Sequence, residues 1–334
     1  MNTDCFVSII VPAYNAKLYL EQCIAAINDS TYTAFELIVV DDASTDGSGE
    51  LAHALGARVI SQRRQGGPAA ARNRGAQAAG GDLLLFVDAD VLLRPDTLSR
   101  VVENFSKRSD ITAVFGSYDD DPAEVNFLSQ YKNLCHHFVH QQSNADAVTF
   151  WAGCGAIRRQ IFLEMGGFDE KRYRHPSIED IELGDRMRQK GHRIFLDKEL
   201  QVKHLKRWGW GSLLRADIFY RAVPWTLLIL QSGHMPNDLN LQVSQKISAG
   251  LVMALLPVLL LTLFRTEFIF LALLLTAAVC LLNYRLYRFL LEKRGLGFAL
   301  RAAPMQFFYY FYSSLVFAVL WLRKQLQGAA IFRG

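Results

Sequence analysis

The sequence lacks the features of several protein classes. Five cysteines are spread irregularly over 334 residues without a Cys-x-x-Cys pair, which argues against a zinc site or a disulfide framework and favours a reducing compartment. There is no compact basic stripe with interleaved aromatic residues, and the formal net charge is +4, so we expect no nucleic-acid partner. The N-terminus has no basic region followed by an apolar one, so we expect no signal peptide.

Apolar residues are abundant but unevenly distributed. They make up 51% of the chain and concentrate after Lys246 in three runs, at residues 247–264, 268–282 and 304–322. A membrane-spanning helix needs about 20 mostly apolar residues, so the first and third runs are long enough and the second is short. We expect about three transmembrane helices within residues 247–322, followed by a tail at 323–334.

The segment at residues 213–246 links this apolar region to the rest of the chain. Its first part mixes Arg215, Asp217 and Arg221 with apolar and aromatic residues. This pattern favours an amphipathic helix at the bilayer surface, although a buried core helix is an equally plain interpretation.

The expected topology follows from charge. The predicted loop at 285–303 carries five basic residues against the single acid Glu292, which predicts a cytoplasmic loop. With two spans before it, the N-terminal domain is then also cytoplasmic, on a multi-pass protein of the inner or plasma membrane. Arg323 and Lys324 argue against this topology, because after a third span these basic residues would lie on the non-cytoplasmic side of the membrane. A third apolar segment that is re-entrant or interfacial is the alternative.

Residues 1–212 read as an α/β domain. Short apolar, β-rich runs alternate with helical stretches, which predicts a doubly wound, mostly parallel sheet. In such sheets ligands bind beyond the carboxyl ends of the strands. The predicted strands are residues 7–11, 36–40, 58–61, 83–87, 112–115, 194–196 and 201–205, and the main predicted helices are 17–27, 68–79, 123–142 and 177–190.

Carboxylates follow two of these strands. Asp41 and Asp42 end the second strand, and Asp88 and Asp90 follow the run Leu-Leu-Leu-Phe-Val. Two acids in an Asp-x-Asp pattern face the same way in extended chain and suit Mg²⁺ or Mn²⁺, which share oxygen ligands with phosphates. An Asp-x-Asp on its own is more often a surface turn. The buried strand before it reverses that preference here.

Asp41 and Asp42 have two interpretations. The sequence that follows, Ala-Ser-Thr-Asp-Gly, is typical of a turn, and Ser44 or Thr45 could cap the next helix. The functional interpretation is a carboxylate that accepts a hydrogen bond from the N3–H of a uracil or from another base edge. We prefer it because Asp88 and Asp90 repeat the pattern.

Glu179 and Asp180 begin a predicted helix. Ser177-x-x-Asp180 is similar to a capping box, so Asp180 could serve only the helix start. A carboxylate is also the group that deprotonates an acceptor hydroxyl in glycosyl transfer. The neighbouring Glu179 would raise the proton affinity of the pair and the helix N-terminus would lower it. We favour the catalytic interpretation.

Other candidates carry weaker signals. His204 either reaches the metal or diphosphate or is a structural histidine. Trp208 could stack on a sugar or lie in the membrane interface. Arg72 could contact phosphate or uracil, or be a solvated helix residue. We place Gly153, Gly155 and Trp208 in the acceptor region.

Several stretches together resemble the family 2 glycosyltransferases. The match spans about residues 6–205 and is specific because its motifs occur in order. The stretches are residues 7–15 (Val-Ser-Ile-Ile-Val-Pro-Ala-Tyr-Asn), 36–47 (Glu-Leu-Ile-Val-Val-Asp-Asp-Ala-Ser-Thr-Asp-Gly), 71–75 (Ala-Arg-Asn-Arg-Gly), 86–90 (Phe-Val-Asp-Ala-Asp), 166–170 (Gly-Gly-Phe-Asp-Glu) and 179–180 (Glu-Asp).

The resemblance implies a GT-A fold, a nucleotide-sugar donor, a divalent metal and inversion at the anomeric carbon. It assigns Pro12, Tyr14 and Asp42 to the nucleoside, Asp88 and Asp90 to diphosphate and metal, and Asp180 to the base. With the candidates above, the expected site is: catalytic Asp180 and Glu179; donor-binding Pro12, Tyr14, Asn15, Asp41, Asp42, Arg72 and Asp88; metal-binding Asp88, Asp90 and His204.

The function we expect is transfer of one sugar, with a UDP-sugar favoured, to a lipid or lipid-linked acceptor at the membrane. Some family members hold a growing polymer with Gln-x-x-Arg-Trp. Residues 203–208 have the Arg-Trp pair without the Gln, which disfavours processive synthesis. The alternatives are a polysaccharide synthase and a non-catalytic membrane protein that binds nucleotide-sugar. A nucleotidyltransferase is set aside because Pro-Ala-Tyr-Asn is not a Gly-rich triphosphate loop.

Overall fold

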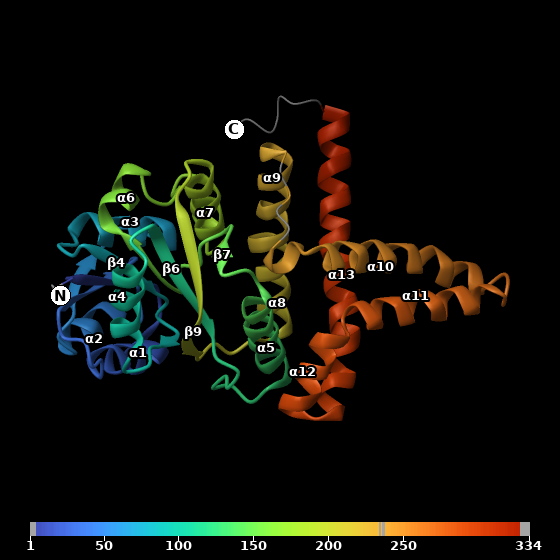
Figure 1. Cartoon of the computed structure of the whole chain (residues 1–334), viewed down its shortest axis with the longest axis horizontal. Coiled ribbons are helices and arrows are strands. Elements are labelled where there is room, and N and C mark those ends of the chain that lie inside the picture. Colours follow the sequence, from blue (N-terminus) through green and yellow to red (C-terminus); the bar gives the residue numbers. More distant parts are fainter. Residues whose placement is uncertain (1–4, 234, 236–237, 328–334) are drawn as a thin grey trace. The chain divides into compact units, whose positions relative to one another are not determined.

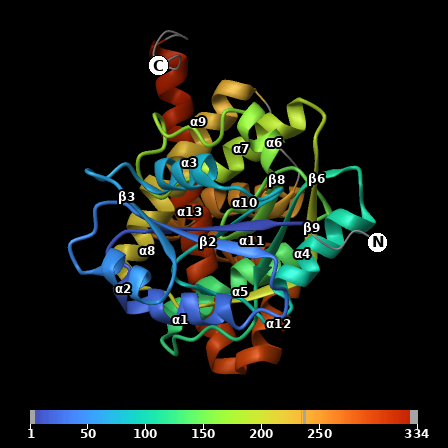
Figure 2. The same ribbon diagram turned by 90° about the vertical axis from the view of Figure 1, so that its left-hand side faces the viewer.

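The chain folds into two compact units, and the boundary between them lies between Arg207 and Trp208. The structure is a computed structural model that describes residues 5–233, 235 and 238–327. We call Met1–Arg207 the N-terminal unit and Trp208–Gly334 the C-terminal unit. Figures 1 and 2 show their elements, and each unit is described by itself.

The N-terminal unit is built on one mixed sheet with the strand order β3-β2-β1-β4-β8-β6-β9-β5, and β7 pairs with β9. The pairs β1–β2, β2–β3, β1–β4 and β6–β9 are parallel, and the others are antiparallel. The strands are β1 Val7–Ala13, β2 Phe35–Asp41, β3 Arg58–Ser61, β4 Leu83–Val87, β5 Val91–Leu92, β6 Ile111–Tyr118, β7 Asp146–Ala147, β8 Cys154–Arg158 and β9 Arg193–His204.

Helices cover both faces of the sheet. Successive residues of a strand point to opposite faces, and here both faces are buried: in β4, Leu85 packs with one core cluster and Phe86 with the other. On the first face lie α1 (Lys17–Asn28), α2 (Ser48–Ala54) and α4 (Thr97–Lys107); on the second lie α3 (Pro68–Ala78), α6 (Arg159–Glu164) and α7 (Glu179–Gln189). A further helix, α5 (Phe127–Gln142), packs along β6.

The predicted α/β class is confirmed, with differences in detail. The sheet is mixed because β8 runs antiparallel between β4 and β6, and β8 itself was not predicted. The two short strands expected at 194–196 and 201–205 are one strand, β9. Arg100 and Asn104 bind the Asp197 carboxylate between them, and the strand continues through an irregularity in its register with β6.

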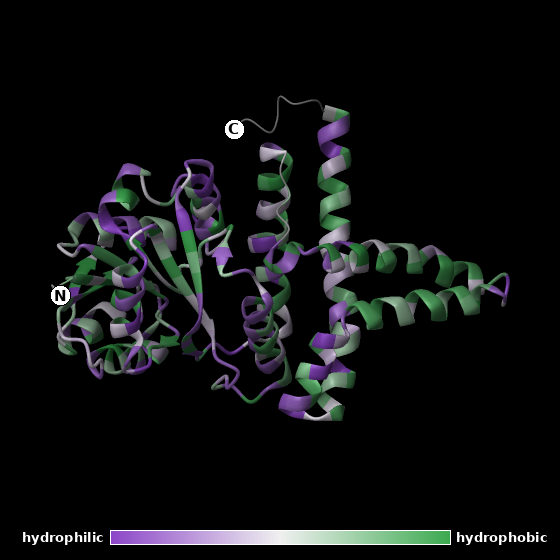
Figure 3. Ribbon diagram, viewed as in Figure 1, coloured by the Kyte–Doolittle hydropathy of each residue, from purple (hydrophilic) through white to green (hydrophobic). Residues whose placement is uncertain are grey.

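The C-terminal unit is helical. It contains α8 (Trp210–Asp217), a π-helical stretch (Ile218–Ala222), α9 (Val223–Ser232), a short 3₁₀ turn (Leu239–Leu241), α10 (Val243–Thr262), α11 (Phe268–Leu282), α12 (Tyr284–Arg294) and α13 (Leu296–Gln327). Helices α10 and α11 form a hairpin that consists mostly of hydrophobic residues (Figure 3).

Two described helices are long and apolar enough to cross a membrane, Val243–Thr262 and Leu296–Leu326. The pair α11 and α12 passes the same test only together and is bent by 67°. The predicted loop at 285–303 is wrong, since these residues form α12 and the start of α13. The basic stretch has a helical period, with Leu286 and Leu290 buried four residues apart, so it makes an amphipathic helix.

A close backbone approach fixes α7 beside the sheet. At Gly184 an added Cβ would lie 2.3 Å from the backbone nitrogen of Phe150. Ala is a better helix former than Gly by about 1 kcal/mol, so propensity alone predicts that Gly184→Ala is stabilising. We expect the clash to dominate and to lower the free energy of unfolding by about 1–3 kcal/mol, measured by denaturant titration in detergent.

The matched control is Gly211→Ala in α8, where an added Cβ meets nothing within 4 Å. Equal stability of the two variants would show that α7 does not depend on this contact.

Candidate active site

The loops after β1 and β2 are tied together by Asn15. Its backbone has φ +48°, in the left-handed region that Asn adopts more readily than most residues. The side-chain oxygen accepts from the backbone N–H of Thr45 at 2.9 Å, and its own N–H donates to Ser44 Oγ at 3.0 Å. Ser44 and Thr45 therefore join two loops and do not cap α2, which begins after Gly47. Asp41 accepts from the N–H of Ser44 at 3.1 Å, as in a turn.

Asp42 is buried and accepts three hydrogen bonds. They come from Gln62 Nε2 (2.8 Å) and from the backbone N–H groups of Gly66 (2.7 Å) and Gly67 (2.8 Å). Burial raises the pKa of Asp42, and the bonds from the two glycines oppose that rise. The carboxylate therefore fixes the loop that leads into α3. A carboxylate has about four acceptor sites, so one is left for a base edge.

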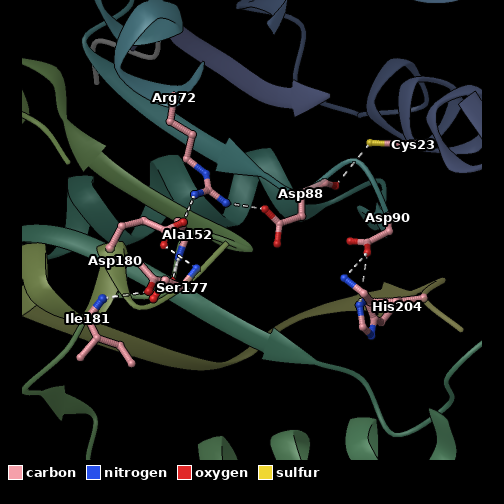
Figure 4. A network of polar contacts seen from close by, with 11 residues as sticks. Cys23, Arg72, Asp88, Asp90, Ala152, Ser177, Asp180, Ile181 and His204 are labelled. Carbon is pink, nitrogen blue, oxygen red and sulfur yellow. Dashed lines mark hydrogen bonds and ion pairs between the residues drawn. The ribbon is translucent and has the colours of Figure 1, made fainter. Parts of the chain in front are cut away.

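Arg72 of α3 lies at the centre of the site and is 5% exposed, so the solvated interpretation is wrong. Its Nη2 donates to Asp88 Oδ1 at 2.6 Å and its Nη1 to Glu179 Oε1 at 2.8 Å (Figure 4). Burial alone would lower the pKa of Arg72, but the charges of Asp88, Glu179 and Asp180 outweigh it and hold the pKa above its usual value. Arg72 thus joins the end of β4 to the start of α7.

Asp180 stands beside this ion-pair network. Its Oδ2 accepts from the backbone N–H of Ala152 at 3.0 Å and its Oδ1 from that of Ile181 at 2.8 Å. Burial and the charge of Glu179 raise the pKa of Asp180 to about 7, against the opposing effects of the Ala152 hydrogen bond and Arg72. Helix α7 begins at Glu179 with Ile178 at its N-cap, so Ser177 does not form the capping box that its spacing suggested.

Glu179 has a different environment from its neighbour. It is buried, and its second oxygen accepts from the backbone N–H of Ser177 at 2.9 Å, while the first binds Arg72. With both oxygens held by the protein, Glu179 is arranged to position Arg72 and Asp180.

Asp90 has its own partners, separate from Arg72. Its Oδ2 lies 3.7 Å from His204 Nε2 and 3.6 Å from Lys206 Nζ, because β5 pairs with the end of β9. Burial alone would raise the pKa of Asp90, but His204 and Lys206 hold it below its usual range. The His204 ring stacks on Tyr118 of β6, with centroids 4.0 Å apart and planes 13° apart.

The two acids of the Asp-x-Asp pattern therefore turn to different partners: Figure 4 shows the Asp88 carboxylate beside Arg72 and the Asp90 carboxylate facing His204. Among the described residues, no group of three His, Cys, Asp or Glu side chains could hold a metal ion by itself. Mg²⁺ and Mn²⁺ sites in phosphate-binding enzymes commonly use one or two protein ligands and complete the shell with substrate phosphates and water. Asp90 and His204 fit a site of that kind.

The other predicted residues lie as follows. Pro12 is in β1 opposite Val40, and Tyr14 follows β1 with 47% of its surface exposed. Gly153 accepts a hydrogen bond from the backbone N–H of Asp88 at 3.2 Å. At Gly155 an added Cβ would lie 2.3 Å from the carbonyl oxygen of Trp151, so this glycine serves packing. Trp208 is buried in the C-terminal unit, with Arg221 over its ring at 5.9 Å.

The sequence analysis missed Asn73, the residue that holds the Gly-Gly-Phe-Asp-Glu motif at residues 166–170 in place. Asn73 donates to the Phe168 carbonyl and to Glu170, and its oxygen accepts from the Phe168 N–H, each at 2.9 Å. The motifs 71–75 and 166–170 are thus one structural unit. The presence of both motifs in one chain was the only sequence feature that could have indicated this contact. Nothing in the sequence pointed to Tyr118 or to the backbone of Ala152.

Residues 8–166 match the sequence profile of glycosyl transferase family 2. The N-terminal unit contains a family 2 glycosyltransferase domain. Glycosyltransferase GlyG of Streptococcus pneumoniae is 32% identical over 126 residues, which are 36% of this chain and 42% of GlyG. An uncharacterized Haemophilus influenzae glycosyltransferase is 27% identical over 48% of this chain and 55% of its own length. The chain thus spans about half the length of these relatives or less.

Solved structures agree on the fold of this family 2 domain. A Pyrobaculum calidifontis mannosyltransferase, PcManGT, in complex with GDP-Man and Mn²⁺, superposes with a TM-score of 0.59 at 17% identity, over 93% of this chain and 86% of that chain. Staphylococcus aureus TarS 1–349 in complex with UDP superposes with a TM-score of 0.50 at 18% identity, over 67% and 64%. These likenesses confirm the GT-A-type architecture.

Replacing Arg72 tests the buried network. In Arg72→Ala, Asp88 and Glu179 each lose a charged partner, and removing one member of a buried ion pair typically costs about 3–5 kcal/mol. We expect a loss of that size in the free energy of unfolding, measured by denaturant titration in detergent.

Lys107→Ala is the control, because Lys107 pairs with Glu103 at a site where both side chains are exposed. Such a pair contributes about 0–1 kcal/mol. An Arg72→Ala variant no less stable than Lys107→Ala would contradict the central role of Arg72.

Proposed function

We propose that the protein is a membrane-associated, inverting, metal-dependent glycosyltransferase. It transfers one sugar from a nucleotide-sugar, with a UDP-sugar favoured, to a lipid or lipid-linked acceptor of cell-envelope polysaccharide or glycolipid synthesis. The observation that carries the proposal is the Asp180 carboxylate, held by the Ala152 N–H, with a pKa raised to about 7 beside the Arg72 network.

Asp180 acts as the general base. A base works best when its pKa lies near the working pH, since it is then largely ionised and still binds a proton well. One oxygen takes the proton of the acceptor hydroxyl while the hydroxyl oxygen bonds to the anomeric carbon. The bond from that carbon to the diphosphate oxygen breaks, and the electron pair leaves with the nucleoside diphosphate. Attack opposite the leaving group inverts the configuration.

Asp90, His204 and Lys206 serve the leaving diphosphate. Asp90 and His204 would hold a divalent ion, which when bound neutralises negative charge on the diphosphate. Lys206 brings a further positive charge within 3.6 Å of Asp90. Arg72 is buried between Asp88 and Glu179, so we assign it to positioning those acids and not to direct donor binding.

The nucleoside lies in this proposal against the loops after β1 and β2, beside Tyr14, Asn15 and the remaining acceptor site of Asp42. Of the similar solved structures, TarS 1–349 is in complex with UDP and PcManGT with GDP-Man. Both types of donor should therefore be tested. The acceptor assignment is supported by the apolar helices of the C-terminal unit, two of which are long enough to cross a bilayer.

Loss of the base is the first test. We expect Asp180→Asn to lower kcat by about 10²–10⁴-fold, the usual contribution of a general base, in a radiolabelled-sugar transfer assay with membrane lipid as acceptor. The control is Asp185→Asn on the same helix, whose carboxylate accepts a hydrogen bond from Gln189 and which should retain activity. Full activity of Asp180→Asn would refute the proposed base.

The pH dependence follows from the environment of Asp180. A base must be ionised, so kcat should rise tenfold per unit below pH 7 and level off above it. Glu179 raises the pKa of Asp180, second only to burial, so Glu179→Gln should move the rising limb to lower pH. Steady-state rates between pH 5 and 9 measure both. A limb that moves to higher pH in Glu179→Gln would contradict this assignment.

Donor and metal are identified together. Ligands that bind the native state raise the melting temperature, so UDP- and GDP-sugars should be screened against the detergent-solubilised protein with Mn²⁺ or with EDTA. We expect a UDP-sugar to give the largest shift, and EDTA or Asp90→Ala to abolish it. Polymeric product on a gel would favour a polysaccharide synthase, and UDP binding without turnover a non-catalytic protein.

A further inference from the structure

The α10–α11 hairpin presents apolar side chains on all sides. Residues 247–264 and 268–284 contain no charged residue. Leu260, Phe270 and Leu274 are 63%, 79% and 65% exposed, which is unfavourable in water. At 1.5 Å per residue the 20 residues of α10 span about 30 Å, the thickness of a bilayer's hydrocarbon core, and the 15 residues of α11 span about 22 Å. The turn between the helices carries Arg265 and Glu267.

A buried polar cluster marks the base of this hairpin. Tyr310 of α13 donates to Gln245 at the start of α10 and lies 2.6 Å from the side-chain oxygen of Asn283, after the end of α11. Asn283 in turn donates to Ser248 Oγ at 3.0 Å. The cluster fastens both ends of the hairpin to the middle of α13.

Helix α13 has charged residues beside its middle. Tyr312 donates to Asp217 Oδ2 at 2.8 Å, and Asp217 is 3.1 Å from Arg221. If the apolar run 304–322 crossed a bilayer, its midpoint near Tyr312 would place this charged pair at the bilayer centre. Ionisable side chains cost at least about 2.5–3.5 kcal/mol each there. At the membrane surface the cost disappears.

The directions of the helices agree with this. In Figures 1 and 2, α13 keeps the same direction, and the hairpin runs across it. A straight bilayer-spanning path is therefore available to the hairpin or to α13, but not to both. Basic side chains gather on the elements at the base of the hairpin, where anionic lipid headgroups would meet them: Arg285, Arg288, Lys293, Arg294 and Arg301 on α12 and α13, and Arg323 and Lys324 at the end of α13.

We propose that the α10–α11 hairpin alone crosses the bilayer, and that α12 and α13 lie along one membrane surface among anionic headgroups. Both ends of the described C-terminal unit then emerge on the same side. Arg323 and Lys324 join the other basic residues there, which removes the conflict that three crossing helices create with the positive-inside rule. The proposal does not depend on catalysis, so loss of the proposed function would leave it standing.

Cysteine accessibility tests the arrangement. A full-length protein with its five cysteines replaced by alanine receives one new cysteine, Thr266→Cys at the hairpin turn, Glu292→Cys on α12 or Gln325→Cys near the end of α13; all three positions are exposed. Sealed vesicles of both orientations are treated with a membrane-impermeant maleimide. We expect Glu292→Cys and Gln325→Cys to label from one side and Thr266→Cys from the other.

The readout separates the alternatives. If α13 also crossed, Gln325→Cys and Thr266→Cys would label from the same side. If the hairpin lay on the surface, all three would label from one side. Either result would overturn the proposal.

Depth measurements give a second, independent test. A bimane label is placed at the middle of α11 (Leu274→Cys) or of α13 (Leu315→Cys), both exposed positions. Lipids carry a nitroxide near the headgroup or deep in the chain. The deep nitroxide should quench the Leu274 label at least twofold more than the shallow one, and the order should reverse for Leu315. Deep quenching at Leu315 would show that α13 enters the core.

Discussion

The buried guanidinium of Arg72 is the contact on which the site depends. It joins Asp88, at the end of β4, to Glu179, at the start of α7, which lie 16 and 107 positions away from Arg72 in the sequence. Neither acid is stable in a low-dielectric site without a partner, and Arg72 satisfies both with one planar group. The end of the sheet and the helix that carries Asp180 are thereby held in one geometry, and Asn73, the next residue, fixes the turn at Phe168.

This arrangement divides the acids into groups with different properties. Asp88 and Glu179 share the single charge of Arg72, Asp90 is paired with His204 and Lys206, and Asp180 accepts from two backbone N–H groups and has the like charge of Glu179 beside it. As a result, the pKa of Asp90 lies below its usual range while that of Asp180 is raised to about 7. Environments that separate the pKa values of two carboxylates in one site allow one to remain a charged ligand while the other accepts a proton.

In the C-terminal unit, too, the surroundings of charged groups decide the arrangement. By length and hydropathy alone, both α10 and α13 could cross a bilayer. The polar side chains that contact them distinguish the two. Asp217 and Arg221 lie beside the middle of α13, whereas the exposed positions Leu260, Phe270 and Leu274 of the hairpin are apolar.

The sequence alone determined the local elements and the family. Short, nearly continuous apolar runs predicted β1, β2 and β4, because both faces of these strands are buried, and the motifs at their ends predicted where the acids gather. Other features depended on tertiary contacts. Strand β8 has no distinctive pattern, and β9 continues through Asp197, whose carboxylate is bound by the distant residues Arg100 and Asn104. Arg72 was predicted to bind the donor or to be a solvated helix residue, and its ion pairs were not foreseen, since its partners are 16 and 107 positions away. The burial and the ion pairs of these acids depend on such distant residues. Only the folded chain therefore decides which carboxylate is held in an ion pair and which has a raised pKa and can accept a proton.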